Sequence, residues 1–272
     1  MSDRITLTLR QPLTESMEVD GLAPDQLATL GTNEIAALPM WAGAERAQIG
    51  DLFAIDGEQS DRVLIRGDLS RLHGVGMRMR GGMLTIEGPV GRRVAAGMSD
   101  GIVTIVGDAG DDAGVAMGGG LLRIHGNAGD RLAAASPGAA KGMTGGEVIV
   151  DGSVGAHAAE RARRGLVVIG RDAGEGAGHR MIAGTLVVFG NVGAHPGIGN
   201  KRGSIVALGS IDVPATYDYA CTFDPPHVRL LLQYLRRRHG VPIDDRLMTG
   251  PYRRFCGDVG DPGKGEILVF AG

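Results

Sequence analysis

The chain repeats itself every 19 residues, and this period constrains its fold more than any other feature of the sequence. Seven short segments begin with a glycine, and apolar residues stand two and four positions after each glycine. The seven glycines are Gly82, Gly101, Gly120, Gly146, Gly165, Gly184 and Gly203. Successive glycines are 19 residues apart, except for one interval of 26, which is 19 plus an insertion of 7. A unit this short cannot bury an apolar face alone, so the units must stack on one another.

Each unit carries the pattern of one short strand between tight corners. Apolar residues two positions apart are typical of a strand with one buried face. Five of the seven units have a methionine three residues before the glycine, where it can fill the interior, and Gly or Ala stands six residues before it. Glycine permits positive φ at corners. The sequence therefore predicts an all-β fold, a right-handed parallel β-helix of about seven 19-residue coils.

The two ends of the chain do not follow the repeat. We expect residues 1–60 to form an N-terminal cap, 61–213 the glycine-rich β-helix, and 214–272 a C-terminal cap with a helix and a final strand. Open solenoid ends would otherwise expose unpaired edges. The C-terminal helix is expected to end before Gly240, and its apolar stripe consists of Val228, Leu231, Leu232 and Leu235.

Composition narrows the class of protein. A net charge of −3 and a pI near 6.2 argue against a nucleic-acid partner. The two cysteines, Cys221 and Cys256, have no metal-ligand spacing, and no apolar run is long enough for a membrane span. We therefore expect a cytoplasmic protein with no catalytic residues and no metal site of its own.

Three segments together resemble the C subunit of formylmethanofuran dehydrogenases. They are the tandem glycine-rich unit, LPMWAGAERAQIGDLFAIDGE at 38–58, and GDVGDPGKGEILVF at 257–270. The glycine-rich β-helix of glutamate synthase is a more distant resemblance. The first resemblance implies a scaffold subunit in a complex whose chemistry lies on other subunits. Such a complex would contain amidohydrolase-like, formyltransferase-like or molybdopterin-subunit-like partners and a methanofuran-type carrier, with no cofactor bound by this chain alone.

The resemblance covers two kinds of complex. One is a bacterial formyltransferase/hydrolase complex, which moves a formyl group from formyl-tetrahydromethanopterin to the carrier and hydrolyses it to formate. The other is the molybdenum or tungsten formylmethanofuran dehydrogenase. The use of 25 arginines against three lysines favours the bacterial complex. A third hypothesis, a stand-alone β-helix enzyme acting on a polyanion, has only Asp111 and Asp130 beside Arg92 as candidate residues.

Two surfaces are candidate binding sites. An apolar row on the outer face of four strands could dock a partner subunit, unless the chain's own cap covers it; it consists of Ile149, Val168, Val187 and Val206. A basic corner could hold the glutamate-rich tail that the resemblance implies for the carrier, although solvated surface is the simpler interpretation. Its residues are Arg161, Arg163, Arg164, Lys201 and Arg202.

Polar residues also recur at one corner column. His157 and His195 lie two coils apart in this column, with Gly176 between them, too far apart to share one metal ion readily. Earlier members of the column, Arg93, Asp112 and Arg131, alternate in charge. We predict a solvated polar corner.

Overall fold

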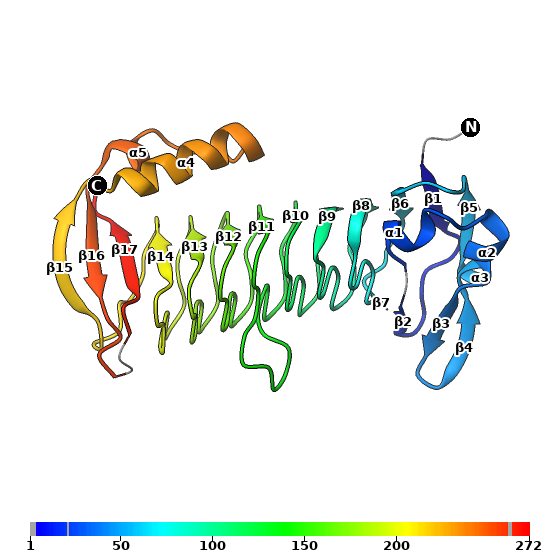
Figure 1. Ribbon diagram of the computed structural model, residues 1–272, viewed down its shortest axis with the longest axis horizontal. Helices are drawn as coiled ribbons and strands as arrows, with labels where there is room; N and C mark the ends of the chain where they lie inside the picture. Colours follow the sequence, from blue (N-terminus) through cyan, green and yellow to red (C-terminus); the bar gives the residue numbers. More distant parts are fainter. Residues whose placement is uncertain (1–3, 21, 261–262) are drawn as a thin grey trace.

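The computed structural model describes residues 4–20, 22–260 and 263–272. It is mostly β, with one 13-stranded sheet that runs the length of the molecule and a four-stranded sheet at the N-terminal end (Figure 1). The large sheet has the order β15-β16-β17-β14-β13-β12-β11-β10-β9-β8-β6-β1-β5. Its strands are β1 (Ile5–Leu9), β5 (Phe53–Asp56), β6 (Arg62–Arg66), β8 (Arg80–Glu87), β9 (Asp100–Val106), β10 (Leu121–Ile124), β11 (Glu147–Val150), β12 (Leu166–Ile169), β13 (Thr185–Val188), β14 (Ser204–Ala207), β15 (Asp218–Phe223), β16 (Tyr252–Cys256) and β17 (Glu266–Phe270).

Helices and the small sheet lie at the two ends. The small sheet consists of β4 (Glu45–Gln48), β3 (Pro39–Ala42), β2 (Met17–Val19) and β7 (Leu72–His73), in that order. The helices are α1 (Pro24–Leu27), α2 (Thr32–Ala36), α3 (Ile49–Leu52), α4 (Pro226–His239) and α5 (Arg246–Thr249). The predicted C-terminal helix is confirmed, because α4 ends at His239, directly before the cap residue Gly240, which has a positive φ of 64°. Among the described residues, no helix has the length and hydropathy needed to cross a bilayer.

The seven repeated units form strands β8 to β14, and each strand pairs in parallel with the next. Equivalent residues of neighbouring units are paired, as in Leu122↔Val103 and Val167↔Leu186. A second line of parallel bridges crosses the same coils, from Leu69 through Val90 and onward to Ile211. Each coil is therefore joined to its neighbours along two lines.

The run of parallel strands is longer than the seven units. Strand β6 pairs in parallel with β8, and β1 pairs in parallel with β6. The second half of the repeat motif is present in β6 as Val63, Ile65 and Gly67, but its 21-residue offset from β8 breaks the 19-residue period. At the other end, β17 pairs in parallel with β14 after a long excursion of the chain.

The interior of the stack is apolar, as the repeat predicts. The two inward-facing residues of every repeated strand are buried, and so are the five repeat methionines Met79, Met98, Met117, Met143 and Met181. Asn200 takes the methionine place in the last coil and is fully buried. Its side-chain amide bonds the backbone N–H and C=O of Gly203, which satisfies the buried polar group.

Positive φ recurs along several columns of the stack, and at three of these columns many of the residues are not glycine. Among the described residues, twelve of the 13 non-glycine residues with positive φ lie in these three columns. The first column holds Arg93, Asp112, Arg131, His157 and His195; the second holds Ala95, Ala133 and Ala159; the third holds Arg78, Ala116, Arg161 and Arg180. For a residue other than glycine, this left-handed backbone conformation costs about 1–2 kcal/mol. Hydrogen bonds between coils hold the backbone there, for example Arg93 N–H to Asp111 O at 2.8 Å.

Candidate functional surfaces

The apolar row on the outer sheet face is covered by the chain's own helix. Ile149, Val168, Val187 and Val206 are all at most 1% exposed. They belong to one cluster with Val228, Leu232 and Leu235 of α4, which lies across this part of the sheet in Figure 1. The prediction that this row docks a partner subunit is therefore wrong for the folded chain. The alternative interpretation, a cap packed on the row, is the one the structure has.

The helix covers only part of the sheet. At 14 residues, α4 is about 21 Å long, close to the span of four strand intervals at about 4.8 Å each. Its last turn stops over β10 and β11, where Arg123 Nη1 donates to His239 O at 3.3 Å and Arg123 Nη2 pairs with Asp151 Oδ1 at 2.5 Å. Beyond this point the middle row continues as Thr104 and Thr85, which are half-buried.

The predicted basic corner gathers at one side of the stack. Arg163 N–H bonds Met143 O, and Lys201 N–H bonds Met181 O, so both residues occupy the same position on their coils. Arg163, Arg164, Lys201 and Arg202 are exposed, and none has an acidic partner among the described residues. Arg161 differs, because its Nη1 donates to Ala139 O at 2.6 Å and its Nε lies 3.6 Å from Glu160 Oε1.

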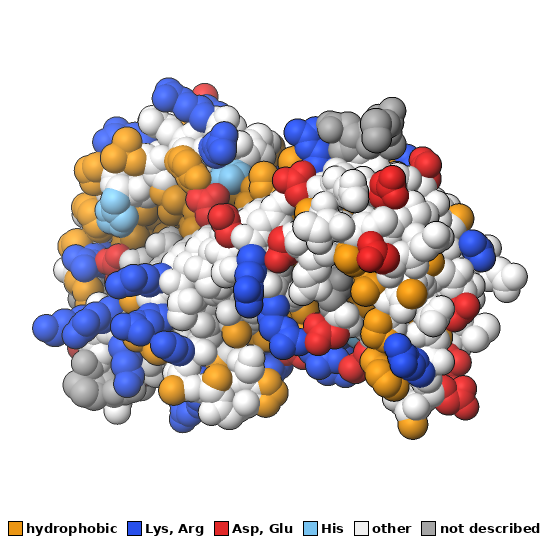
Figure 2. All heavy atoms as spheres, turned by 45° about the vertical axis from the view of Figure 1, so that its right-hand side comes forward, with side chains coloured by type: hydrophobic (Ala, Val, Ile, Leu, Met, Phe, Trp, Pro, Cys, Tyr) orange, Lys and Arg blue, Asp and Glu red, His pale blue; other side chains and the backbone are white. Residues whose placement is uncertain are grey.

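A shallow hollow adjoins these cations. Its volume is about 370 Å³, and Arg161, Arg180 and Lys201 line it. Arg180, which the sequence analysis did not include, is exposed and also has no acidic partner in the described part of the chain. Figure 2 shows Lys and Arg side chains gathered toward the lower left of the molecule, whereas acidic side chains lie mainly to the right. The corner is therefore a cationic surface with little internal compensation.

The histidines at the corner do not form a metal site. Among the described residues, no group of three or more His, Cys, Asp or Glu side chains could hold a metal ion. His195 Nδ1 lies 3.0 Å from Glu175 Oε1, while the centroid of the His157 ring lies 5.8 Å from that of the His179 ring, with the two rings tilted by 51°. Burial lowers the pKa of His179, and nearby Glu160 opposes that shift only in part.

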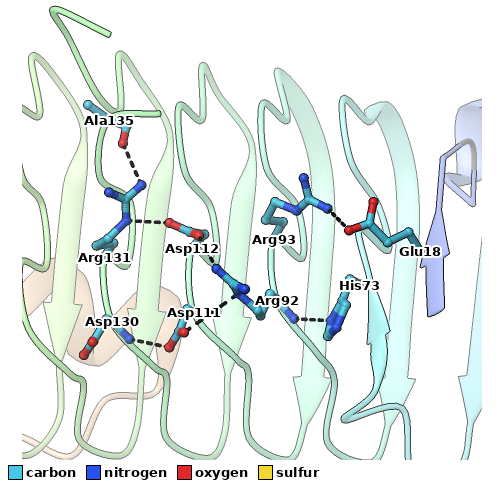
Figure 3. A network of polar contacts seen from close by, with 9 residues as sticks. All are labelled: Glu18, His73, Arg92, Arg93, Asp111, Asp112, Asp130, Arg131 and Ala135. Atoms are coloured by element: carbon cyan, nitrogen blue, oxygen red, sulfur yellow. Dashed lines mark hydrogen bonds and ion pairs between the residues drawn. The ribbon is translucent and has the colours of Figure 1, made fainter. Parts of the chain in front are cut away.

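A ladder of polar contacts joins the first coils, as Figure 3 shows. Arg131 Nε pairs with Asp112 Oδ1 at 2.6 Å, as the charge alternation predicts. Arg93 instead turns toward the N-terminal end and pairs with Glu18 of β2 at 2.7 Å. The sequence could not predict this pair, because Glu18 lies outside the repeat.

The two aspartates of the neighbouring column bond the backbone of the next coil. Asp111 Oδ1 accepts from Asp130 N–H at 3.0 Å, and Asp130 Oδ1 accepts from Ala156 N–H at 2.7 Å. These carboxylates therefore satisfy corner amides, a structural role that accounts for their place in the column. The hypothesis of a stand-alone enzyme had these residues as its candidates, and the structure gives that hypothesis no support.

A hollow of about 680 Å³ lies beside this ladder. Its floor includes Met77, Ala96 and Val115, and its rim carries Arg92 and His73. Arg92 N–H donates to His73 Nδ1 at 3.0 Å. Burial lowers the pKa of His73, and the charges of Arg92 and Arg93 add to this shift while Glu18 opposes it.

Comparison with known proteins places the chain among its relatives. It is 43% identical over 264 residues to the C subunit of the formyltransferase/hydrolase complex Fhc from Methylorubrum extorquens, covering 97% of this chain and 98% of that protein. The chain belongs to the family of Fhc C subunits. A chain in the crystal structure of the formyltransferase/hydrolase complex FhcABCD from Methylorubrum extorquens, in complex with methylofuran, has a TM-score of 0.90 and 37% identity. That match covers 98% of this chain and 100% of the other.

The family of Fhc C subunits has a more distant relative in a dehydrogenase. The C subunit of the molybdenum-containing formylmethanofuran dehydrogenase 1 from Methanosarcina barkeri is 27% identical over 95 residues. This alignment spans 33% of the present chain and 32% of that protein. No protein-family model matches the chain. The resemblance to the C subunit of formylmethanofuran dehydrogenases is thus confirmed, and the Fhc match extends over nearly the whole length.

Proposed function

We propose that this chain is the C subunit of a formyltransferase/hydrolase complex and acts there as a non-catalytic scaffold. The complex would transfer a formyl group from formyl-tetrahydromethanopterin to a methanofuran-type carrier and hydrolyse it to formate. The observation that carries the proposal is the 43% identity to the Fhc C subunit over 97% of the chain. The full-length structural match to a chain of FhcABCD supports it.

The way the polar residues are used supports the proposed scaffold role. The aspartates of the corner bond backbone amides, and the interior is filled by apolar side chains. We propose that the chemistry belongs to amidohydrolase-like and formyltransferase-like partners, with a molybdopterin-subunit-like protein beside them. The scaffold itself we take to be a right-handed parallel β-helix at 61–213 between caps at 1–60 and 214–272. Parallel strands joined by crossover connections are right-handed in about 98% of cases, which supports this handedness.

Purification of the tagged chain from its own organism tests the assignment. We expect the A, B and D subunits to co-purify with it, and the eluate to release formate from formyl-tetrahydromethanopterin. The isolated chain is expected to be inactive. Recovery with a molybdopterin-containing dehydrogenase in place of these subunits would support the alternative complex, and recovery of the chain alone would contradict both.

The basic corner is proposed as a contact for the carrier tail. Arg163, Arg164, Lys201 and Arg202 present exposed positive charge, with Arg161 at its edge, and a tail rich in carboxylates would pair with it. The probe is a synthetic oligoglutamate peptide, whose binding to the purified chain should weaken as salt increases. Arg163→Glu with Lys201→Glu should weaken binding at least tenfold. Arg237→Glu with Arg238→Glu, at exposed positions of α4, is the matched control; equal losses in both pairs would contradict a site at this corner.

A further inference from the structure

The hollow of about 680 Å³ is built from features that occur on only some of the coils. Its floor follows one column of the repeat, the residue that precedes the third positive-φ column. In the first four coils this residue is Met77, Ala96, Val115 and Ala134, and these side chains form a separate apolar cluster outside the main core. In the following three coils the same column holds Glu160, His179 and Ile198. The first three of these apolar residues line the hollow, and the apolar strip ends with the coil that carries the inserted loop.

Small residues give the hollow its depth. The neighbouring column holds Gly97 and Ala116 on two adjacent coils, whereas arginine occupies it on three other coils, as Arg78, Arg161 and Arg180. Gly199 occupies it on the last coil, outside the trough. Arginine side chains in place of Gly97 and Ala116 would lie over the floor. Their absence leaves Val115 at the bottom of an open trough, with only 6% of its surface exposed.

The seven-residue insertion closes one end of the trough. Ser136 and Pro137 of this loop line the hollow, and Ala134 beneath it is fully buried. The loop is fastened on both sides, since Arg131 Nη2 donates to Ala135 O at 3.2 Å and Arg161 Nη1 donates to Ala139 O at 2.6 Å. Insertions into solenoids are often found on the binding face.

One arginine on the rim has hydrogen-bond donors to spare. Arg93 and Arg78 each pair with an N-terminal carboxylate at 2.7 Å. Arg92 is different, because it forms only long ion pairs, with nitrogens 3.8 Å from Asp111 Oδ2 and 3.7 Å from Asp112 Oδ2, beyond hydrogen-bond distance. Its side chain is 59% exposed. The trough thus combines an apolar floor with a guanidinium that can bind a further carboxylate.

We propose that this trough docks an extended segment of a partner subunit, with small apolar side chains on the floor and a carboxylate on Arg92. The inference rests on the proposed function, which supplies the partner subunits. The floor from Met77 to Val115 spans two coil intervals, about 10 Å at 4.8 Å each, which about three extended residues would cover. A single guanidinium at the rim of an apolar strip fits an acidic residue next to apolar ones.

Co-expression of the tagged chain with the A, B and D subunits of the same organism tests the proposal. Val115→Trp fills the floor, and Arg92→Glu reverses the rim charge; each should reduce the partner subunits recovered with the tag at least tenfold. Ile198→Trp, in the same column outside the trough, and Arg171→Glu, at another exposed arginine, are the matched controls and should assemble like the wild type. Thermal unfolding of each isolated variant shows whether it is folded. If Val115→Trp does not fold, the recovery of partner subunits by Arg92→Glu alone tests the proposal.

A photo-crosslinking residue at Ser136 identifies the occupant. Crosslinks to one acidic, extended segment of a partner subunit support the proposal. If both trough variants recover as much of the partner subunits as the wild type does, the docking proposal is overturned. The proposed function would still stand in that case, because the wild-type chain assembles. Crosslinks that reach no partner subunit would also overturn the docking proposal. If the wild-type chain itself recovers no partner, the proposed function fails first and the docking site fails with it.

Discussion

The outer sheet face and the corner of the same coils differ in how uniform their side chains are. On strands β11 to β14 the outer middle row is Ile149, Val168, Val187 and Val206, sealed beneath α4. At the corner, one column varies freely through Arg93, Asp112, Arg131, His157, Gly176 and His195. The corner tolerates this variety because hydrogen bonds between coils fix its backbone whatever the side chain is. Buried contacts of the sheet therefore stabilise such a coil, while the side chains at its corner can differ from one coil to the next.

Placing a charge under α4 should break the sealed face. Val187→Lys puts an unpaired ammonium between β13 and the helix, which should lower the free energy of unfolding by about 3–5 kcal/mol. Denaturant unfolding of the isolated chain measures this loss. Thr85→Lys is the matched control, because Thr85 lies in the same row beyond the reach of α4 and is half-buried. It should change stability by less than about 0.5 kcal/mol. Equal losses from both substitutions would contradict the difference between the two halves of the sheet.

Relieving the backbone at the corner should have a smaller effect of opposite sign. His195 is exposed and has a φ of 59°, a conformation that glycine adopts more readily. His195→Gly should therefore raise the free energy of unfolding by up to about 1 kcal/mol, because the exposed contact with Glu175 contributes little. His227→Gly, at an exposed position in the first turn of α4, should instead be destabilising. A loss of stability in His195→Gly would show that its side chain matters more than its backbone.

The corner should also give the fold a mild sensitivity to acid. Burial holds the pKa of His179 below its ordinary value of 6.5, so below that pH the unfolded chain binds more protons than the folded one. The free energy of unfolding should therefore be constant above about pH 7 and decrease as the pH falls through 6.5. His179→Gln should flatten this slope, measured by thermal unfolding from pH 7.5 to pH 5.5. An unchanged slope in His179→Gln would assign the sensitivity to other groups, His73 first among them.

Much of the stack could be predicted because its pattern is local. Residues two apart on a strand face the same side, so the rows around Leu122 or Val167 can be assigned to the interior from the sequence alone. The burial of the repeat methionines and the end of α4 before Gly240 follow from equally local signals. Only the non-glycine residues at positive φ depart from this simple pattern, since the coil-to-coil hydrogen bonds impose the conformation on alanine and arginine alike.

The sequence by itself determined which residues are apolar and how they repeat, but the tertiary structure decided what each apolar surface contacts. Burial of apolar area has no direction, so a row such as Val168 and Val187 is satisfied equally by a partner or by α4. The helix reaches that row because the chain returns across the sheet before β17 adds to β14. The trough also exists only in three dimensions, since it joins Glu18 of the N-terminal sheet, coils 19 residues apart and one inserted loop.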